Sequence, residues 1–211
     1  MARAPKDSAA PKKAAAKPRK KNAEVDELKF VEALSAAGLN VDLIVQSTHE
    51  GSSNDIAFTL PEADLAPAHA VCETVLRGLE ASGAQLSAVA GMAKLSIAGA
   101  GIMGRPGVAA RLFDTLARLG INLRLIATSE VKVSCLVEAG QGAKALRATA
   151  AAFELADQQL RQAPLPCAVD APPVRGVALD RDQAQVSVRR VPDRPGSAAV
   201  ICRALADAGI S

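Results

Sequence analysis

The 211-residue sequence predicts an α+β fold made of ferredoxin-like units with the element order βαββαβ, one unit complete and two partial. The first observation is a repeat, in which Ala/Leu-rich helices end at Gly38, Gly120 and Gly209. These glycines lie 82 and 89 residues apart. The second observation is that two strands and then another helix follow the glycine in the first two copies. This order predicts an antiparallel sheet with both helices on one face.

The first copy covers residues 28–91 and lacks its leading strand. Its elements are expected to be a helix, two strands, a second helix and a short closing strand, at residues 28–37, 41–45, 54–60, 66–83 and 84–90. A glycine such as Gly38 ends a helix because it can adopt the left-handed conformation. Runs of alternating or continuous apolar residues predict the strands.

The second copy, residues 92–165, is expected to be complete. After its leading strand, the turn Arg105-Pro106-Gly107 leads into the helix that ends at Gly120. Two strands and a second helix are then predicted, at residues 123–126, 131–137 and 142–155.

The third copy begins with a linker and leading strand at residues 166–183 and continues as residues 184–211, with a strand expected from Ala184. Its turn Arg194-Pro195-Gly196 lies 89 residues after Arg105-Pro106-Gly107. In both copies the glycine of the turn precedes the helix-ending glycine by 13 residues. The sequence stops where the second strand would begin, so this copy is expected to be truncated.

Residues 1–27 are rich in Ala, Lys and Pro, and we expect them to be disordered because they offer little to bury. Residues 1–22 carry a net charge of +7, which leaves −4 for the rest of the chain. A solvated leader, a non-specific nucleic-acid or membrane contact and a transit peptide remain as alternatives for this tail. The acidic body predicts no specific nucleic-acid partner. No apolar run approaches the roughly 18 residues that span a bilayer, so no membrane partner is expected.

The four cysteines and two histidines are widely spaced, with no pair at zinc-ligand spacing. We therefore expect no metal, no cofactor and no catalytic residue. The cysteines are interpreted as small apolar residues of a protein in the reducing cytoplasm, and the histidines show no pattern of a catalytic base.

A G-x-G-x-x-G motif at Gly99, Gly101 and Gly104 raises the alternative of a nicotinamide-dependent enzyme. The repeat argues against it, because the third copy keeps the Pro-Gly turn without the three glycines. A dinucleotide fold would also need an acidic residue about 20 residues further on, at the end of a second parallel strand, and Glu130 lies too far along. The glycines would still allow a small ligand to approach the backbone.

Several motifs resemble the tandem ACT domains of aspartate kinases. The second copy carries Gly99-Ala100-Gly101, the helix start 106–110, Ile121-Asn122 and Thr128-Ser129-Glu130, which match the family's second ACT domain. Residues 40–47 and 54–65 resemble the back of the first ACT domain, and residues 174–211 resemble its front. The resemblance covers roughly residues 30–211. Its order is similar to a slice through a cyanobacterial member with four ACT domains, without the kinase domain.

In this family the kinase phosphorylates L-aspartate with ATP, in the first step towards lysine, threonine and methionine, and ACT domains bind lysine or threonine as feedback inhibitors. The resemblance implies that ACT domains of another copy are partners in a homo-oligomer. It implies effector-binding residues on a strand of the first copy, in the glycine-rich loop, on the second copy and in the third copy's turn. These are Asn40, Val41, Asp42, Gln46, Met103, Gly104, Gly107, Asn122, Ser129, Glu130 and Asp193.

Plainer interpretations of these residues stay open. Asp42 can be the solvent face of a strand, Asn122 a turn residue, and Glu130 a surface partner of Lys132. Arg118 and Arg124 are interpreted as surface charges. For the whole chain, the alternative to a regulatory region of an aspartate kinase, inactive on its own, is a stand-alone ACT-domain amino-acid sensor.

Overall fold

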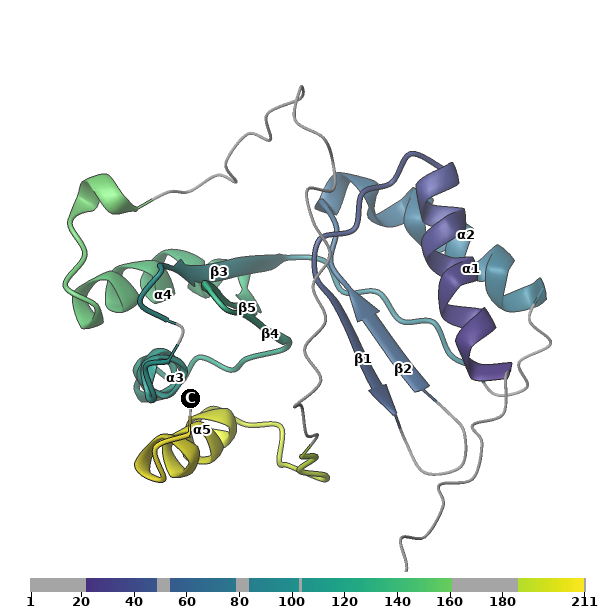
Figure 1. Ribbon diagram of the computed structural model, residues 1–211. Coiled ribbons are helices and arrows are strands. Elements are labelled where there is room, and N and C mark those ends of the chain that lie inside the picture. Colours follow the sequence, from purple (N-terminus) through teal and green to yellow (C-terminus); the bar gives the residue numbers. More distant parts are fainter. Residues whose placement is uncertain (1–21, 49–53, 79–83, 103, 161–185, 211) are drawn as a thin grey trace, which may run out of the picture. The chain divides into compact units, whose positions relative to one another are not determined.

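The computed structural model describes residues 22–48, 54–78, 84–102, 104–160 and 186–210 (Figure 1). The chain divides into two compact units, one formed mainly by residues up to Leu86 and the other mainly by residues from Ser87 onward. The expected tail at residues 1–21, the linker at 166–183 and the predicted site residue Met103 lie outside the described residues.

The first unit contains two helices and a two-stranded sheet. Its elements are α1 (Asn22–Ala36), β1 (Ile44–Thr48), β2 (Asn54–Phe58), η1 (Glu62–Asp64) and α2 (Leu65–Gly78). Strands β1 and β2 pair with each other, and α1 packs against α2. The buried side chains of Leu34, Ala68 and Cys72 form the centre of this core.

Two expectations for the first copy are corrected. Helix α1 begins at Asn22, six residues before the expected start, so residues 22–27 do not belong to a disordered tail. Residues 84–90 form no strand. Of these mostly small residues only Leu86 packs against the core, and Val89 is 71% exposed.

The second unit is built on a three-stranded antiparallel sheet with the order β3-β5-β4. Its elements are β3 (Met92–Ala98), α3 (Val108–Arg118), β4 (Ile126–Ser129), β5 (Lys132–Glu138), α4 (Ala139–Ala152), η2 (Asp157–Gln159) and α5 (Ser197–Asp207). Leu95 lies opposite Cys135 and Ile97 opposite Val133, so their buried side chains share one face. Helices α3 and α4 pack on this face, with Leu116 fully buried between the elements.

Two further strands are missing from the described part of the second unit. Residues 153–160 contain the short helix η2 and no closing strand. Residues 186–190, expected to form a strand, are not assigned to one, and Val186 and Val188 are 88% and 60% exposed. An alternating strand forms when a neighbour pairs with its backbone and covers its apolar side, and these side chains are left uncovered.

The helix ends repeat as predicted. Gly38, Gly120 and Gly209 adopt φ angles of +71°, +72° and +74°. In each case the N–H of the residue after the glycine donates to the carbonyl of the residue five positions earlier, at 2.9, 3.0 and 2.9 Å. This is the hydrogen bond of a helix-ending turn that only glycine adopts without strain. The repeat is therefore structural as well as sequential.

The Pro-Gly turns repeat as well, and they bring α3 and α5 together (Figure 1). Gly107 and Gly196 begin the two helices with φ angles of +93° and +94°. A Cβ atom at Gly107 would lie 3.7 Å from Cβ of Ala206, and one at Gly196 would lie 3.6 Å from Cβ of Ala117. Each helix thus begins beside the end of the other, which describes an antiparallel pair.

Charged side chains join the same two helices. Arg203 of α5 forms an ion pair with Asp114 of α3. Asp114 also accepts a hydrogen bond of 3.2 Å from Arg118 on its own helix. Ala199 of α5 is buried in the core of the second unit. The third copy is therefore packed against the second copy through its helix.

Candidate functional site

A pocket of about 260 Å³ lies between the segment that follows α3 and the segment that leads into α5. Its lining comes from α3 and residues 121–126 on one side and from residues 191–201 on the other. The lining residues are Phe113, Ile121, Asn122, Leu123, Ile126, Val191, Pro192, Asp193, Arg194, Gly196, Ser197, Ala198, Ala199 and Ile201.

The carboxylate of Asp193 is the centre of the polar contacts in this pocket. Asn122 donates a hydrogen bond from Nδ2 to Oδ1 of Asp193 at 2.8 Å. Nη1 of Arg124 lies 3.5 Å from Oδ2 of the same carboxylate. The side chain of Asp193 is 69% exposed, so it can accept a further donor from a bound molecule. Residues 71 positions apart in the sequence thus meet at one charged group.

Local backbone structure places Asn122 and Arg124. The helix-ending turn at Gly120 reverses the chain just before Asn122. The N–H of Arg124 then donates to the carbonyl of Leu136 at 3.0 Å, and the N–H of Leu136 donates to the carbonyl of Leu125 at 2.9 Å. The consecutive residues Arg124 and Leu125 therefore share one partner on β5, Leu136. Such a bulge changes the direction of nearby side chains and ends the regular strand pairing.

Asp193 belongs to a turn that is held by its own hydrogen bonds. The hydroxyl of Ser197 donates to the carbonyl of Pro192 at 2.7 Å, and the N–H of Arg194 donates to the same carbonyl at 3.0 Å. Arg190, just before the turn, adopts a left-handed φ of 57°. The turn therefore holds Asp193 in front of the N-terminus of α5.

The N-terminus of α5 has no side-chain cap. The first backbone bond within the helix runs from the N–H of Val200 to the carbonyl of Gly196 at 3.0 Å. The N–H groups of the first turn, including those of Ala198 and Ala199, point out of the helix end and have no partner within a regular helix. With the helix dipole, they form a favourable environment for a carboxylate.

Much of the remaining lining is apolar. Phe113 and Ile121 are 3% and 1% exposed and line the pocket, and Ile126 and Val191 add aliphatic surface. The pocket thus combines one carboxylate, the N–H groups of a helix end and an apolar wall. These are the partners needed by the ammonium group, the carboxylate and the side chain of a free amino acid.

The other predicted residues that the structure describes do not line this pocket. Asn40, Val41, Asp42 and Gln46 lie in the first copy, where the N–H of Asp42 donates to the carbonyl of Thr59 at 2.9 Å. Their assignment, which came from the resemblance alone, stays a prediction.

The described residues of the glycine loop and of the β4–β5 turn do not line the pocket either. Gly104 and Gly107 lie before α3, both with positive φ. Ser129 and Glu130 lie in the turn between β4 and β5, where the Ser129 hydroxyl donates to the carbonyl of Lys132 at 3.4 Å. Of the ten predicted residues that the structure describes, two line the pocket, Asn122 and Asp193.

Arg124 is the polar residue that sequence reasoning missed, since it was interpreted as a surface charge. The repeat contains a signal that could have identified it. Asn40 and Asn122 occupy the same position after the helix-ending glycine, and two residues later stand Asp42 and Arg124. A change of charge sign at one position of a repeat indicates a local difference in what that position contacts.

The glycine-rich loop does not form a dinucleotide site of the usual kind. It follows β3, and the sheet β3-β5-β4 is antiparallel throughout. The dinucleotide-binding turn belongs to a parallel sheet, at the point where the strand order reverses. Within the loop, the N–H of Ile102 donates to the carbonyl of Gly99 at 3.2 Å.

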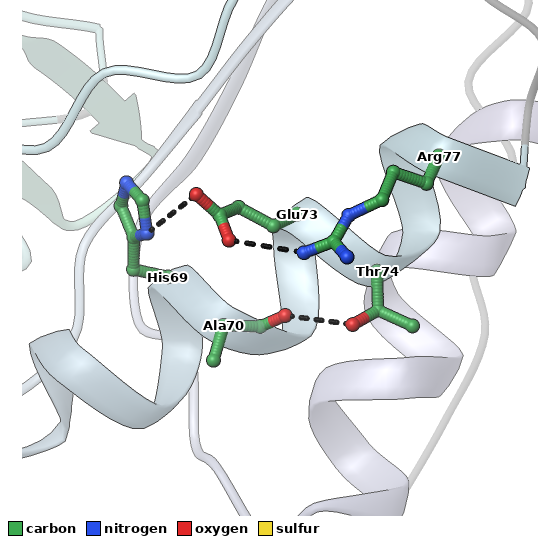
Figure 2. Close-up of polar contacts among 5 residues, drawn as sticks. All are labelled: His69, Ala70, Glu73, Thr74 and Arg77. Atoms are coloured by element: carbon green, nitrogen blue, oxygen red, sulfur yellow. Dashed lines mark hydrogen bonds and ion pairs between the residues drawn. The ribbon is translucent and has the colours of Figure 1, made fainter.

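The described histidine, His69, and two buried cysteines lie in the following surroundings. His69 lies on α2 with its Nδ1 3.6 Å from Oε1 of Glu73, in a row of helical pairs that includes Arg77 (Figure 2). Burial raises the pKa of the Cys135 thiol to about 12 and also raises the pKa of the Cys72 thiol. Such thiols remain protonated near neutral pH and are poor nucleophiles.

Metal-binding clusters and membrane-spanning helices are both absent from the described part of the chain. Within it, no group of three or more His, Cys, Asp or Glu side chains is arranged to hold a metal ion. Among the same residues, every helix is too short or too polar to cross a membrane.

Comparison with known proteins places these features in a family. Residues 95–153 match the family model described as an ACT domain. An aspartokinase from Bacillus sp. strain MGA3 is 38% identical over 123 residues, which are 58% of this chain and 29% of that protein. The chain therefore matches less than a third of the length of this relative.

Solved structures give the same result with larger coverage. Aspartate kinase from Synechocystis is 44% identical, with a TM-score of 0.77 over 89% of this chain and 32% of that one. The ligand-free regulatory subunit of aspartate kinase from Thermus thermophilus is 35% identical, with a TM-score of 0.55 over 60% of this chain and 82% of that subunit. The chain therefore belongs to the aspartate kinase family and corresponds to its C-terminal regulatory ACT region.

Proposed function

We propose that the pocket beside Asp193 binds a free amino acid, lysine and/or threonine, as the feedback effector of an aspartate kinase. The observation that carries the proposal is the Asn122–Asp193 hydrogen bond of 2.8 Å at the mouth of an apolar pocket, next to the uncapped N-terminus of α5. Asp193 would accept the α-ammonium group, and the amides of α5 would receive the α-carboxylate. The side chain would lie against the apolar wall.

The pocket suggests how binding would reach a distant kinase domain. It is formed by two copies of the repeat, and α3 and α5 are its rigid supports. A ligand that contacts both copies binds most tightly to one arrangement of the two copies. It therefore shifts the equilibrium towards that arrangement, by the difference between its affinities for the two arrangements. In a longer protein, that arrangement would be transmitted to the kinase domain and would lower its activity.

We also propose that this region forms homo-oligomers through its ACT domains. The support is the resemblance to the ACT domains of aspartate kinases, which implies that the ACT domains of another copy are partners. Light scattering during gel filtration tests this directly, and a monomer at all protein concentrations would contradict it.

Calorimetric titration of the chain with lysine, threonine and methionine tests effector binding. We expect binding of lysine and/or threonine that weakens by about 10- to 150-fold in Asp193→Asn, since a hydrogen bond to a charged group contributes ~1.5–3 kcal/mol. Asp207→Asn is the matched control, because Asp207 is an exposed residue at the other end of α5 and does not line the pocket. Equal affinity in the parent chain and Asp193→Asn would refute the site.

A further inference from the structure

The charges around the pocket are unbalanced. Among the described residues, its lining contains one acidic residue, Asp193, and one basic residue, Arg194. The guanidinium group of Arg124 reaches the carboxylate of Asp193 from outside the lining, at 3.5 Å. The three side chains together carry a net charge of +1. Within the described part of the chain, the pocket thus offers one anionic partner, which Arg124 already contacts.

An amino acid with a cationic side chain needs more than this. Its α-ammonium group would occupy Asp193, and its carboxylate would occupy the N-terminus of α5. A side-chain ammonium group would then find no second carboxylate in the lining and would approach Arg194 or Arg124 instead. Two like charges at ~4 Å repel each other noticeably even in water, and more strongly beside an apolar wall. A neutral side chain avoids this repulsion and gains contact with Phe113 and Ile126.

The position of Arg124 can accept either sign of charge without changing the local fold. In the first copy the corresponding residue is Asp42, and there too the chain pairs with its neighbour, through the N–H of Asp42 and the carbonyl of Thr59. The side chain of Arg124 is 53% exposed, so it contributes little to packing. Its charge is therefore separable from its structural role.

We propose that Arg124 is a specificity-determining residue, which makes this pocket select amino acids with neutral side chains over those with cationic ones. The inference rests on the proposed function and narrows it: the effector of this site is a neutral amino acid, hydroxylated or aliphatic, rather than lysine. Arg124 acts by repulsion of the wrong ligand, a common route to specificity.

Lysine and norleucine form the decisive pair of probes, because lysine differs from norleucine only by an ammonium group in place of one hydrogen atom of the terminal methyl group. Competition calorimetry with the parent chain is expected to show norleucine and threonine binding at least about fivefold more tightly than lysine, equivalent to ~1 kcal/mol. In Arg124→Asp, the ratio of lysine affinity to norleucine affinity should rise by at least about tenfold. Arg124→Gln, which removes the charge without reversing it, should give an intermediate ratio.

Arg147→Asp is the control for net charge, since Arg147 is exposed on α4 and lies outside the pocket. It should leave the ratio unchanged, and circular dichroism should show the same fold in all variants. The inference would be refuted if lysine bound the parent chain as tightly as norleucine, or if the ratio of lysine affinity to norleucine affinity stayed unchanged in both Arg124 variants. In either case, binding that still depends on Asp193 would leave the proposed function standing. If no amino acid shows Asp193-dependent binding, both are refuted.

Discussion

Asn122 offers the sharpest test of the pocket, because its substitution should affect binding much more than stability. In Asn122→Ala the hydrogen bond from Nδ2 to Oδ1 of Asp193 is lost. Asn122 is half-buried and Asp193 is 69% exposed, so water can replace the missing donor when the pocket is empty. The free energy of unfolding should therefore fall by less than ~1 kcal/mol.

The cost is larger once an effector covers the pocket. A ligand over Asp193 excludes the water that would replace Asn122, and it removes a positioned partner from the carboxylate. Leaving a buried polar group without its hydrogen bond costs ~1–3 kcal/mol, which corresponds to a dissociation constant about 5- to 150-fold larger. The effect on binding is thus expected to exceed the effect on stability.

Both quantities can be measured on the same preparations, with urea denaturation for stability and calorimetry with threonine for affinity. Gln85→Ala is the comparison, because Gln85 has an exposed side-chain amide and lies outside this pocket. We expect Gln85→Ala to leave this binding step unchanged. An unaltered threonine affinity in a folded Asn122→Ala would remove Asn122 from the site, and an equal loss in both variants would refute the pocket as the single site.

Three other predictions concern the fold. In urea denaturation, Gly196→Ala should lower the free energy of unfolding by ~1–2 kcal/mol, because Gly196 adopts a φ of +94° that alanine disfavours. Gly140→Ala should raise the free energy of unfolding by about 1 kcal/mol, because Gly140 lies within α4 and an added Cβ atom would meet open space. Leu116→Ala should lower the free energy of unfolding by ~2–5 kcal/mol, since this side chain is fully buried; a loss below 1 kcal/mol would contradict its place in the core. Burial raises the pKa of Cys135 from 9.0 to about 12. Between pH 9 and 12 the folded chain therefore keeps the thiol proton while the unfolded chain loses it. The contribution of this group to the free energy of unfolding is fully present below pH 9 and falls by roughly 1 kcal/mol per pH unit between pH 9 and 12. Denaturation midpoints from pH 8 to 11 should fall less steeply in Cys135→Ala, and parallel curves would refute this.

The sequence by itself determined the ends of the helices. The three helix-ending glycines adopt nearly the same φ angle as one another, as their repetition predicted. The glycines of the two Pro-Gly turns likewise match each other in φ. Such turns depend on hydrogen bonds between residues at most five positions apart, so a short stretch of sequence contains all the information that they need. The helices, the presence of two consecutive strands and the family resemblance followed from the same local patterns. The positions of two strands did not: β4 (Ile126–Ser129) and β1 (Ile44–Thr48) each begin three residues after the expected strands at 123–126 and 41–45.

Strands were less predictable for a physical reason. Residues 84–90 and 186–190 have suitable apolar patterns, yet the structure assigns neither to a strand. A strand satisfies its backbone only through a neighbour, which its own sequence does not specify. The start of α1 was also misplaced, because the boundary between a charged tail and a charged helix has no sharp signal.

The candidate site shows the same division. The family resemblance identified Asn122 and Asp193 separately, but their meeting across 71 residues follows from the packing of α5 on α3. Arg124 gained its role only because the bulge opposite Leu136 and the turn around Pro192 bring it within 3.5 Å of that carboxylate. Local sequence decides which conformation each short segment prefers, whereas the tertiary packing decides which charges become neighbours, since electrostatic interactions depend on distance in space and not along the chain.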